Sequence, residues 1–183
     1  MVSMKTSYKV SLGGVIASLC LVMMFLTAVF PILSMTLPLF AGALMAVVAI
    51  EVSRSWAFVT YAVIVVLAFF VTPDKDAWLF FTFLFGYYPI LKSCFEDHLK
   101  SKLVCFLCKL AVFDAAVTAI FYILMNILGT LDLFEEFGFY NEWLIPALFV
   151  FGNLVFLMYD YVLTILVLSY KKWFRPTFLR KIK

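Results

Sequence analysis

The apolar run from Leu103 to Gly129 constrains this chain more than any other stretch, because it carries one carboxylate, Asp114, near its middle. A second apolar run, Leu144–Tyr170, carries Asp160. Runs of about 20 apolar residues are long enough to cross the hydrocarbon of a bilayer as a helix. A carboxylate inside hydrocarbon is costly unless it faces a partner or a polar cavity. We therefore predict that Asp114 and Asp160 mark a functional site within a membrane.

The composition agrees with lipid as the solvent of this chain. Hydrophobic residues make up 66% of the 183 residues, and aromatic residues make up 19%, whereas soluble domains are about 45–50% apolar. The length leaves no room for a separate soluble domain, so we expect a single domain over residues 1–183. The net charge of +3 is too small to suggest nucleic acid as a partner.

The apolar runs predict an all-α, polytopic membrane protein with six transmembrane helices. The first run has no convincing cleavage site and is longer than the apolar core of a signal peptide, about 7–15 residues, so we expect it to be retained. We predict helices at Val10–Phe30, Leu37–Ile50, Trp56–Val71, Ala77–Leu91, Leu103–Gly129 and Trp143–Tyr170.

The segments between these runs are predicted to be loops. Thr72–Asp76 contains proline and aspartates, which favour turns, and Gly86 and Pro89 are expected to loosen the inner end of the fourth helix. Lys92–Lys102 is predicted to be a mixed-charge loop. Leu131–Glu142 is acidic and aromatic and is expected to hold a short surface helix.

Charge distribution predicts that both termini are cytosolic. With six spans, every lysine and arginine except Lys75 lies inside, as the positive-inside rule requires. Three of the four cysteines then face the reducing cytosol, so we predict no disulfide. Cys105 and Cys108 form a CxxC pair without a second pair, which does not favour zinc.

Polar residues form a stripe on each of the last two helices. Asp114, Thr118, Tyr122 and Asn126 fall within about 120° of the helix circumference. On the sixth helix, Asn153 and Asp160 are seven residues apart and share a face. One loop joins the two helices, which are therefore expected to be neighbours with facing stripes.

Two interpretations of these stripes stay open. They can form a structural cluster in which Lys109 or a shared proton neutralises the acids. Alternatively, Tyr122, Asn126 and Asn153 line a substrate pocket in the outer half of the membrane, with the two aspartates as its floor. Trp78 fits an interfacial aromatic belt, and it is also a candidate for stacking on a flat ligand.

The motifs give no support for an enzyme. Tyr159–Asp160 matches the YD half of intramembrane aspartyl proteases, but Asp114 lacks the GxGD setting of the second half. The chain has no P-loop and no GxSxG motif. The one histidine, His98, is expected to be solvated, and Arg54 is expected to pair with Glu51. We predict no catalytic residue, no metal and no cofactor.

The first helix carries small residues spaced four apart. Gly13 with Ala17, and Gly14 with Ser18, form two overlapping pairs of the kind that lets helix backbones approach closely. The same pairs serve either for packing inside the protein or for docking of a partner membrane subunit.

This layout resembles the substrate-binding (S) component of energy-coupling factor transporters. The resemblance rests on six spans in a chain of this length, on the Leu12–Leu19 start of the first helix, and on the uncharged, proline-bounded loop Pro31–Pro38. It implies that small residues of the first helix contact a transmembrane coupling subunit, and that the loop closes over a vitamin. The stretch Gly86–Ser93 also resembles uncharacterised bacterial membrane proteins of similar layout.

The resemblance leads to an expected function in the bacterial cell membrane. The chain would capture a vitamin or small precursor and hand it inward with a coupling subunit and cytosolic ATPase subunits. Capture needs a concave site with a few polar groups in an apolar lining. The acidic residues of the predicted outer loops favour a neutral or cationic ligand. The alternative is a non-catalytic membrane scaffold or assembly protein of the cell envelope.

Overall fold

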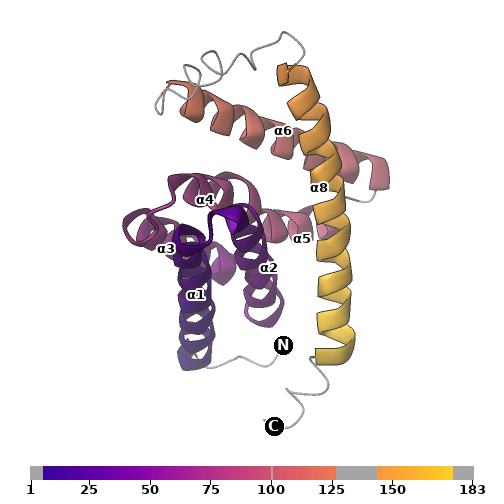
Figure 1. The fold of residues 1–183 in the computed structure, drawn as a ribbon. Helices are drawn as coiled ribbons and strands as arrows, with labels where there is room; N and C mark the ends of the chain where they lie inside the picture. Colours follow the sequence, from indigo (N-terminus) through magenta and orange to yellow (C-terminus); the bar gives the residue numbers. More distant parts are fainter. Residues whose placement is uncertain (1–5, 100, 127–143, 175–183) are drawn as a thin grey trace. The chain divides into compact units, whose positions relative to one another are not determined.

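The computed structural model describes residues 6–99, 101–126 and 144–174, and every element in these ranges is helical (Figure 1). The predicted all-α fold is therefore confirmed for the described part of the chain. Two compact units, Met1–Lys109 and Leu110–Lys183, make up the structure. The single domain over 1–183 stays a prediction.

Three apolar helices pack against one another in the first unit: α1 (Thr6–Val29), α2 (Thr36–Glu51) and α3 (Arg54–Val71). A short 3-10 turn, η1 (Pro31–Leu33), lies between α1 and α2, and Figure 1 shows these two helices side by side. Small and flexible side chains fill the space between the helices. Fully buried examples are Cys20, Met24, Ala41, Met45, Ala57 and Ile64.

Lys75 stabilises the end of α3. Its ammonium Nζ donates to the carbonyl oxygens of Phe69 at 2.7 Å and Thr72 at 3.1 Å, and it lies 4.9 Å from the centre of the Phe69 ring. Carbonyl groups at a helix C-terminus lack intrahelical donors and carry partial negative charge, which a lysine satisfies. The one basic residue predicted outside therefore has a local structural role.

The predicted fourth helix, Ala77–Leu91, is broken into three elements: α4 (Lys75–Phe80), the π-helical segment η2 (Phe81–Phe85) and α5 (Tyr88–His98). The Gly86 amide donates to the Phe81 carbonyl at 2.7 Å, which closes the wide turn.

Tyr61 of α3 and Pro89 of α5 both favour the break in this helix. The Tyr61 hydroxyl donates to the Thr82 carbonyl at 2.6 Å, so a neighbouring helix supplies a donor to the π segment. Pro89 lies in the first turn of α5, where its missing amide hydrogen costs nothing.

The prediction that a loop begins at Lys92 is wrong, because α5 continues to His98. Lys92 and Glu96 are one turn apart on this helix, with Nζ and Oε1 separated by 3.9 Å. Such opposite charges at i and i+4 favour a helix. The charged segment is thus a helix with a polar face.

Gly42 allows α2 to touch the π segment. A Cβ atom at this position would lie 2.3 Å from the Phe85 carbonyl oxygen, and a side chain cannot occupy that space because the obstacle is backbone. Gly86 is similarly close to the Tyr61 ring, where a Cβ would lie 2.7 Å away. Glycine at position 42 permits backbone contact between α2 and the broken helix, and glycine at position 86 makes room for the Tyr61 ring of α3.

The second unit contains α6 (Lys102–Asn126) from Leu110 onward, then α8 (Leu144–Ser169) and a π turn, η3 (Tyr170–Phe174). Two aromatic pairs join α6 to α8. Phe113 stacks on Phe156 with ring centres 4.4 Å apart, and Phe121 stacks on Phe149 at 6.0 Å. The predicted surface helix in Leu131–Glu142 lies outside the described residues.

Four helices of the described part are long and apolar enough to cross a membrane. They are Thr6–Val29, Arg54–Val71, Lys102–Ile123 and Phe149–Trp173, and α2 is a shorter apolar helix. No more than 28% of the apolar stretch in any of the four is buried. Large apolar side chains such as Phe70, 78% exposed, therefore need a cover other than water.

Candidate functional site

A hydrogen bond between Asp114 and Asn153 joins the two polar stripes within the second unit. The Asn153 amide Nδ2 donates to Asp114 Oδ1 at 3.0 Å, and it also donates to the carbonyl oxygen of Phe149, one turn earlier, at 3.0 Å. The carboxylate therefore meets an amide of the neighbouring helix, and that amide is held in place by its own backbone.

Asp114 lies at the midpoint of α6, equally far from Lys102 and Asn126. Its neighbour in the sequence, Phe113, stacks on Phe156 of α8. A Cβ at Gly152 would lie 3.9 Å from the Phe113 ring, an ordinary van der Waals distance, so this ring lies close to the backbone of α8. Asp114 thus lies near the centre of a long apolar helix, and the residue beside it in the sequence stacks on an aromatic ring of α8.

The remaining stripe residues of α6 lie on successive turns beyond Asp114. The Thr118 hydroxyl donates to the Asp114 backbone carbonyl at 2.7 Å, so it is bonded within its own helix. Tyr122 is 67% exposed. Asn126 ends α6, and its side chain lies outside the described residues. A pocket formed by these residues stays a prediction.

Asp160 lies on α8 about 10 Å along the helix axis from Asn153, at about 1.5 Å per residue. It is partly buried, and the Thr164 hydroxyl donates to its backbone carbonyl at 2.9 Å. Its neighbour Tyr159 is only 5% exposed. The hydrogen-bond partner of Asp114 is the amide of Asn153. The spacing of residues along each helix could not identify this pairing of a carboxylate with an amide.

Trp78 belongs to the first unit and joins α4 to α3. Its indole Nε1 donates to the Val65 carbonyl at 2.9 Å, and its ring meets Phe69 edge-on with centres 5.1 Å apart. The indole donor is thus already engaged within the protein. Stacking of Trp78 on a ligand stays a prediction.

Lys109 pairs with an acid of the first unit. Its Nζ lies 2.7 Å from Glu96 Oε1, and Lys92 Nζ lies 3.9 Å from the same oxygen. The side chains of both lysines are less than a tenth exposed, whereas that of Glu96 is 47% exposed. The proposed neutraliser of the membrane acids thus has a carboxylate partner outside the two stripes.

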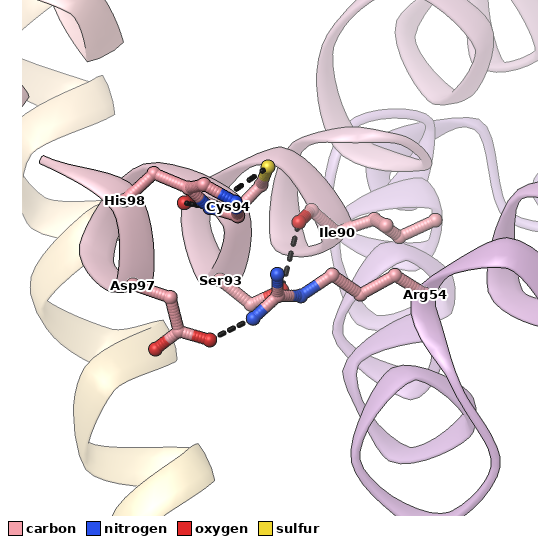
Figure 2. Close-up of polar contacts among 6 residues, drawn as sticks. All are labelled: Arg54, Ile90, Ser93, Cys94, Asp97 and His98. Atoms are coloured by element: carbon pink, nitrogen blue, oxygen red, sulfur yellow. Dashed lines mark hydrogen bonds and ion pairs between the residues drawn. The ribbon is translucent and has the colours of Figure 1, made fainter.

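A second polar contact ties α3 to α5 (Figure 2). Arg54 forms an ion pair with Asp97, and Glu51 is buried. The expected turn pair of Arg54 with Glu51 stays a prediction. Figure 2 also shows the exposed His98, whose Nδ1 lies 2.9 Å from the Cys94 carbonyl oxygen and 3.7 Å from the Cys94 sulfur. Sequence reasoning missed these links because it treated the segment as a loop, although the i,i+4 pair of Lys92 and Glu96 indicated a helix.

The small residues of α1 divide into two faces. Gly13 and Ala17 are buried, and a Cβ at Gly13 would lie 3.1 Å from the Thr60 hydroxyl of α3. Gly14 and Ser18 are exposed, and nothing lies within 4 Å of a Cβ at Gly14. One pair therefore packs inside the unit, and the other lies on its surface.

Among the described residues, no three side chains of histidine, cysteine, aspartate or glutamate come together in a way that could hold a metal ion. No family model, curated protein or solved structure matches this chain.

Proposed function

We propose that this chain is the substrate-capturing membrane subunit of an energy-coupling factor type importer. It binds a vitamin or similar small precursor in the outer half of its helix bundle, and it transfers the ligand inward with a coupling subunit and cytosolic ATPases. In this proposal the chain crosses the bacterial cell membrane six times, with both termini in the cytosol.

The observation that carries the proposal is the Asp114–Asn153 pair. A carboxylate at the centre of an apolar helix is expensive to place in lipid, and ionisable residues in such helices mark substrate or ion pathways in membrane proteins. Here the carboxylate accepts a hydrogen bond from an amide of a second apolar helix. A ligand site needs only a few polar groups in an apolar and aromatic lining. The rings at Phe113 and Phe156 supply such a lining next to the pair.

The exposed pair Gly14 and Ser18 supports a partner subunit. Their side chains are small, and nothing lies within 4 Å of a Cβ at Gly14. The backbone of a second helix can therefore approach this exposed face of α1 closely. Gly13 and Ala17, in contrast, are already covered by the first unit itself. In this proposal the coupling subunit docks at Gly14 and Ser18.

Co-purification of a small molecule tests the proposal. The full chain is purified in mild detergent, and small molecules released on denaturation are identified by mass spectrometry. We expect one compound to accompany the wild-type protein in near-stoichiometric amount and to be lost from Asp114→Asn. Asp76→Asn is the matched control, because it also converts an aspartate to an amide but lies in the first turn of α4. Absence of any such compound from wild-type protein would contradict the proposal.

A membrane scaffold is the second candidate, and it is favoured by the direct contact between Asp114 and Asn153. The amide already satisfies one oxygen of the carboxylate, as expected of a structural clasp between α6 and α8. In that case Asp114→Asn and Asn153→Leu reduce the stability of the purified protein, and no small molecule accompanies it. Co-purification of coupling and ATPase subunits favours the importer.

A further inference from the structure

The apolar helix α8 is followed by a basic segment, Lys171–Lys183. This segment contains six of the chain's 14 lysine and arginine residues and no acidic residue. Its basic residues are Lys171, Lys172, Arg175, Arg180, Lys181 and Lys183. Aromatic and aliphatic residues, such as Trp173 and Phe178, lie between them in the sequence. The segment therefore combines positive charge with apolar side chains.

The first residues of the basic segment lie at the end of a helix that is long enough to cross a membrane. The apolar stretch Phe149–Trp173 has 25 residues, which is about 37 Å at about 1.5 Å per residue. The hydrocarbon core of a bilayer is about 30 Å thick, so a helix centred in it reaches the headgroup layer within its last turn. Lys171 and Lys172 are exposed in this turn, η3, and Trp173 is 70% exposed. Tryptophan favours the headgroup layer, and lysine side chains extend into it.

Lys171 and Lys172 form no ion pair within the described part of their own unit. The acids of that part are Asp114 and Asp160. Asp160 precedes Lys171 by eleven residues, which is about 16 Å along a helix. The first unit differs, because three of its basic residues form ion pairs with acids of α5. The two lysines of η3 are therefore available to negative charges from outside the described part of this unit.

We propose that the basic segment Lys171–Lys183 binds the headgroups of anionic phospholipids. Each basic residue close to an anionic membrane surface strengthens binding by about fivefold. Lipid fits better than a nucleic acid or an acidic protein, because the segment follows a candidate membrane span and its apolar side chains match the boundary between headgroups and acyl chains. This binding requires only that α8 crosses the membrane, so it does not depend on capture of a substrate.

Native mass spectrometry of the full chain tests lipid binding. The protein in nonionic detergent is mixed with equal amounts of phosphatidylglycerol and phosphatidylcholine that have the same acyl chains. We expect wild-type protein to retain phosphatidylglycerol preferentially, and Lys171→Gln/Lys172→Gln to bind it about 25-fold more weakly, at about fivefold for each charge. Lys9→Gln/Lys102→Gln is the matched control, because it removes the same number of charges from α1 and α6 and should leave the preference unchanged. Lys171→Arg/Lys172→Arg keeps both charges and should bind as wild type does.

Equal retention of the two lipids by wild-type protein would overturn the proposal. Equal losses in the glutamine variant and in the control would also overturn it, because overall net charge would then explain the preference. Displacement of phosphatidylglycerol by inorganic phosphate, or retention of an RNA oligonucleotide in place of lipid, would show that the segment recognises an anion other than a membrane surface. If Lys171→Gln/Lys172→Gln does not fold, Arg180→Gln/Lys181→Gln removes two charges of the same segment, and an unchanged lipid preference in that variant counts against the proposal.

Discussion

The two units of this chain achieve cohesion by different means. In the first unit, α1, α2 and α3 interlock through small residues, and at Gly42 two backbones meet without an intervening side chain. In the described part of the second unit, contacts between α6 and α8 include stacked phenylalanine rings and the Asp114–Asn153 hydrogen bond. The comparison indicates that backbone contact at small residues stabilises the first unit, whereas aromatic stacking and an interhelical hydrogen bond stabilise the described part of the second. Both units have exposed apolar faces that need a cover other than water.

Gly42→Ala should cause the largest loss of stability, and it tests whether close packing stabilises the first unit. A methyl group 2.3 Å from the Phe85 carbonyl oxygen must displace backbone, and overpacking of this kind costs about 1–3 kcal/mol or more. Denaturant unfolding in detergent micelles measures the loss. Gly14→Ala is the matched control, since its methyl group meets nothing within 4 Å and alanine favours helix by about 1 kcal/mol. Equal stability of the two variants would contradict the packing argument.

Lys109→Met should have the next largest effect. It removes a 2.7 Å charge-assisted hydrogen bond from a buried ammonium group to Glu96, and such bonds contribute about 1.5–3 kcal/mol. The lower end of that range is expected, because Glu96 is half exposed and keeps Lys92 nearby. Arg54→Gln breaks a more exposed pair with Asp97 and should cost about 0–1 kcal/mol. A larger loss for Arg54→Gln than for Lys109→Met, measured by the same unfolding assay, would reverse this ranking.

A double-mutant cycle measures how much the hydrogen bond between α6 and α8 contributes to the stability of the second unit. Asp114→Ala, Asn153→Ala and the double variant give the coupling energy of their hydrogen bond. Hydrogen bonds between membrane helices average about 0.6 kcal/mol, with a maximum of about 1.7, and we expect a value in this range. The Phe113→Leu and Phe156→Leu cycle serves as a control for aromatic packing alone. Zero coupling between Asp114 and Asn153 would show that the bond does not hold α6 to α8.

The smallest expected effect concerns Asp76, in the first turn of α4. Burial raises the pKa of its carboxyl group above the ordinary value, and the negative charge of Asp74 adds to the rise. The folded protein thus binds this proton more tightly than the unfolded chain, and the associated stability is lost as the pH rises through the raised pKa. Asp76→Asn should therefore gain stability relative to wild type between acidic and neutral pH, measured as the difference in unfolding midpoint. A difference that stays constant with pH would contradict this origin.

The sequence allowed prediction of most helices but not of the break between α4 and α5. Long apolar runs define α1, α3, α6 and α8, because a span of fixed thickness demands a minimum number of apolar residues. The run from Ala77 to Leu91 is equally apolar, so periodicity alone does not reveal its π segment. That segment depends on two residues distant in sequence. Tyr61 donates a hydrogen bond to the Thr82 carbonyl, and Gly42 leaves space for the Phe85 carbonyl.

The candidate site was also predicted only in part from the sequence. The sequence identified Asp114 and Asn153 as polar residues on neighbouring helices, since polar groups in apolar runs stand out. It could not identify which stripe residues meet, because the offset between two helices depends on packing of rings such as Phe113 and Phe156. It also could not show that Lys109 is engaged by Glu96, since the segment containing Glu96 was interpreted as a loop.

The contact at Gly42 also has a consequence for how this fold can diverge. Most positions on the exposed face of α1 can exchange one apolar residue for another, because lipid adapts to their shape. Position 42 has no such freedom while α2 rests on the Phe85 carbonyl. Any descendant of this chain that keeps the broken helix should therefore retain glycine there, and in a library of random variants selected for insertion this codon should be among the last to tolerate change.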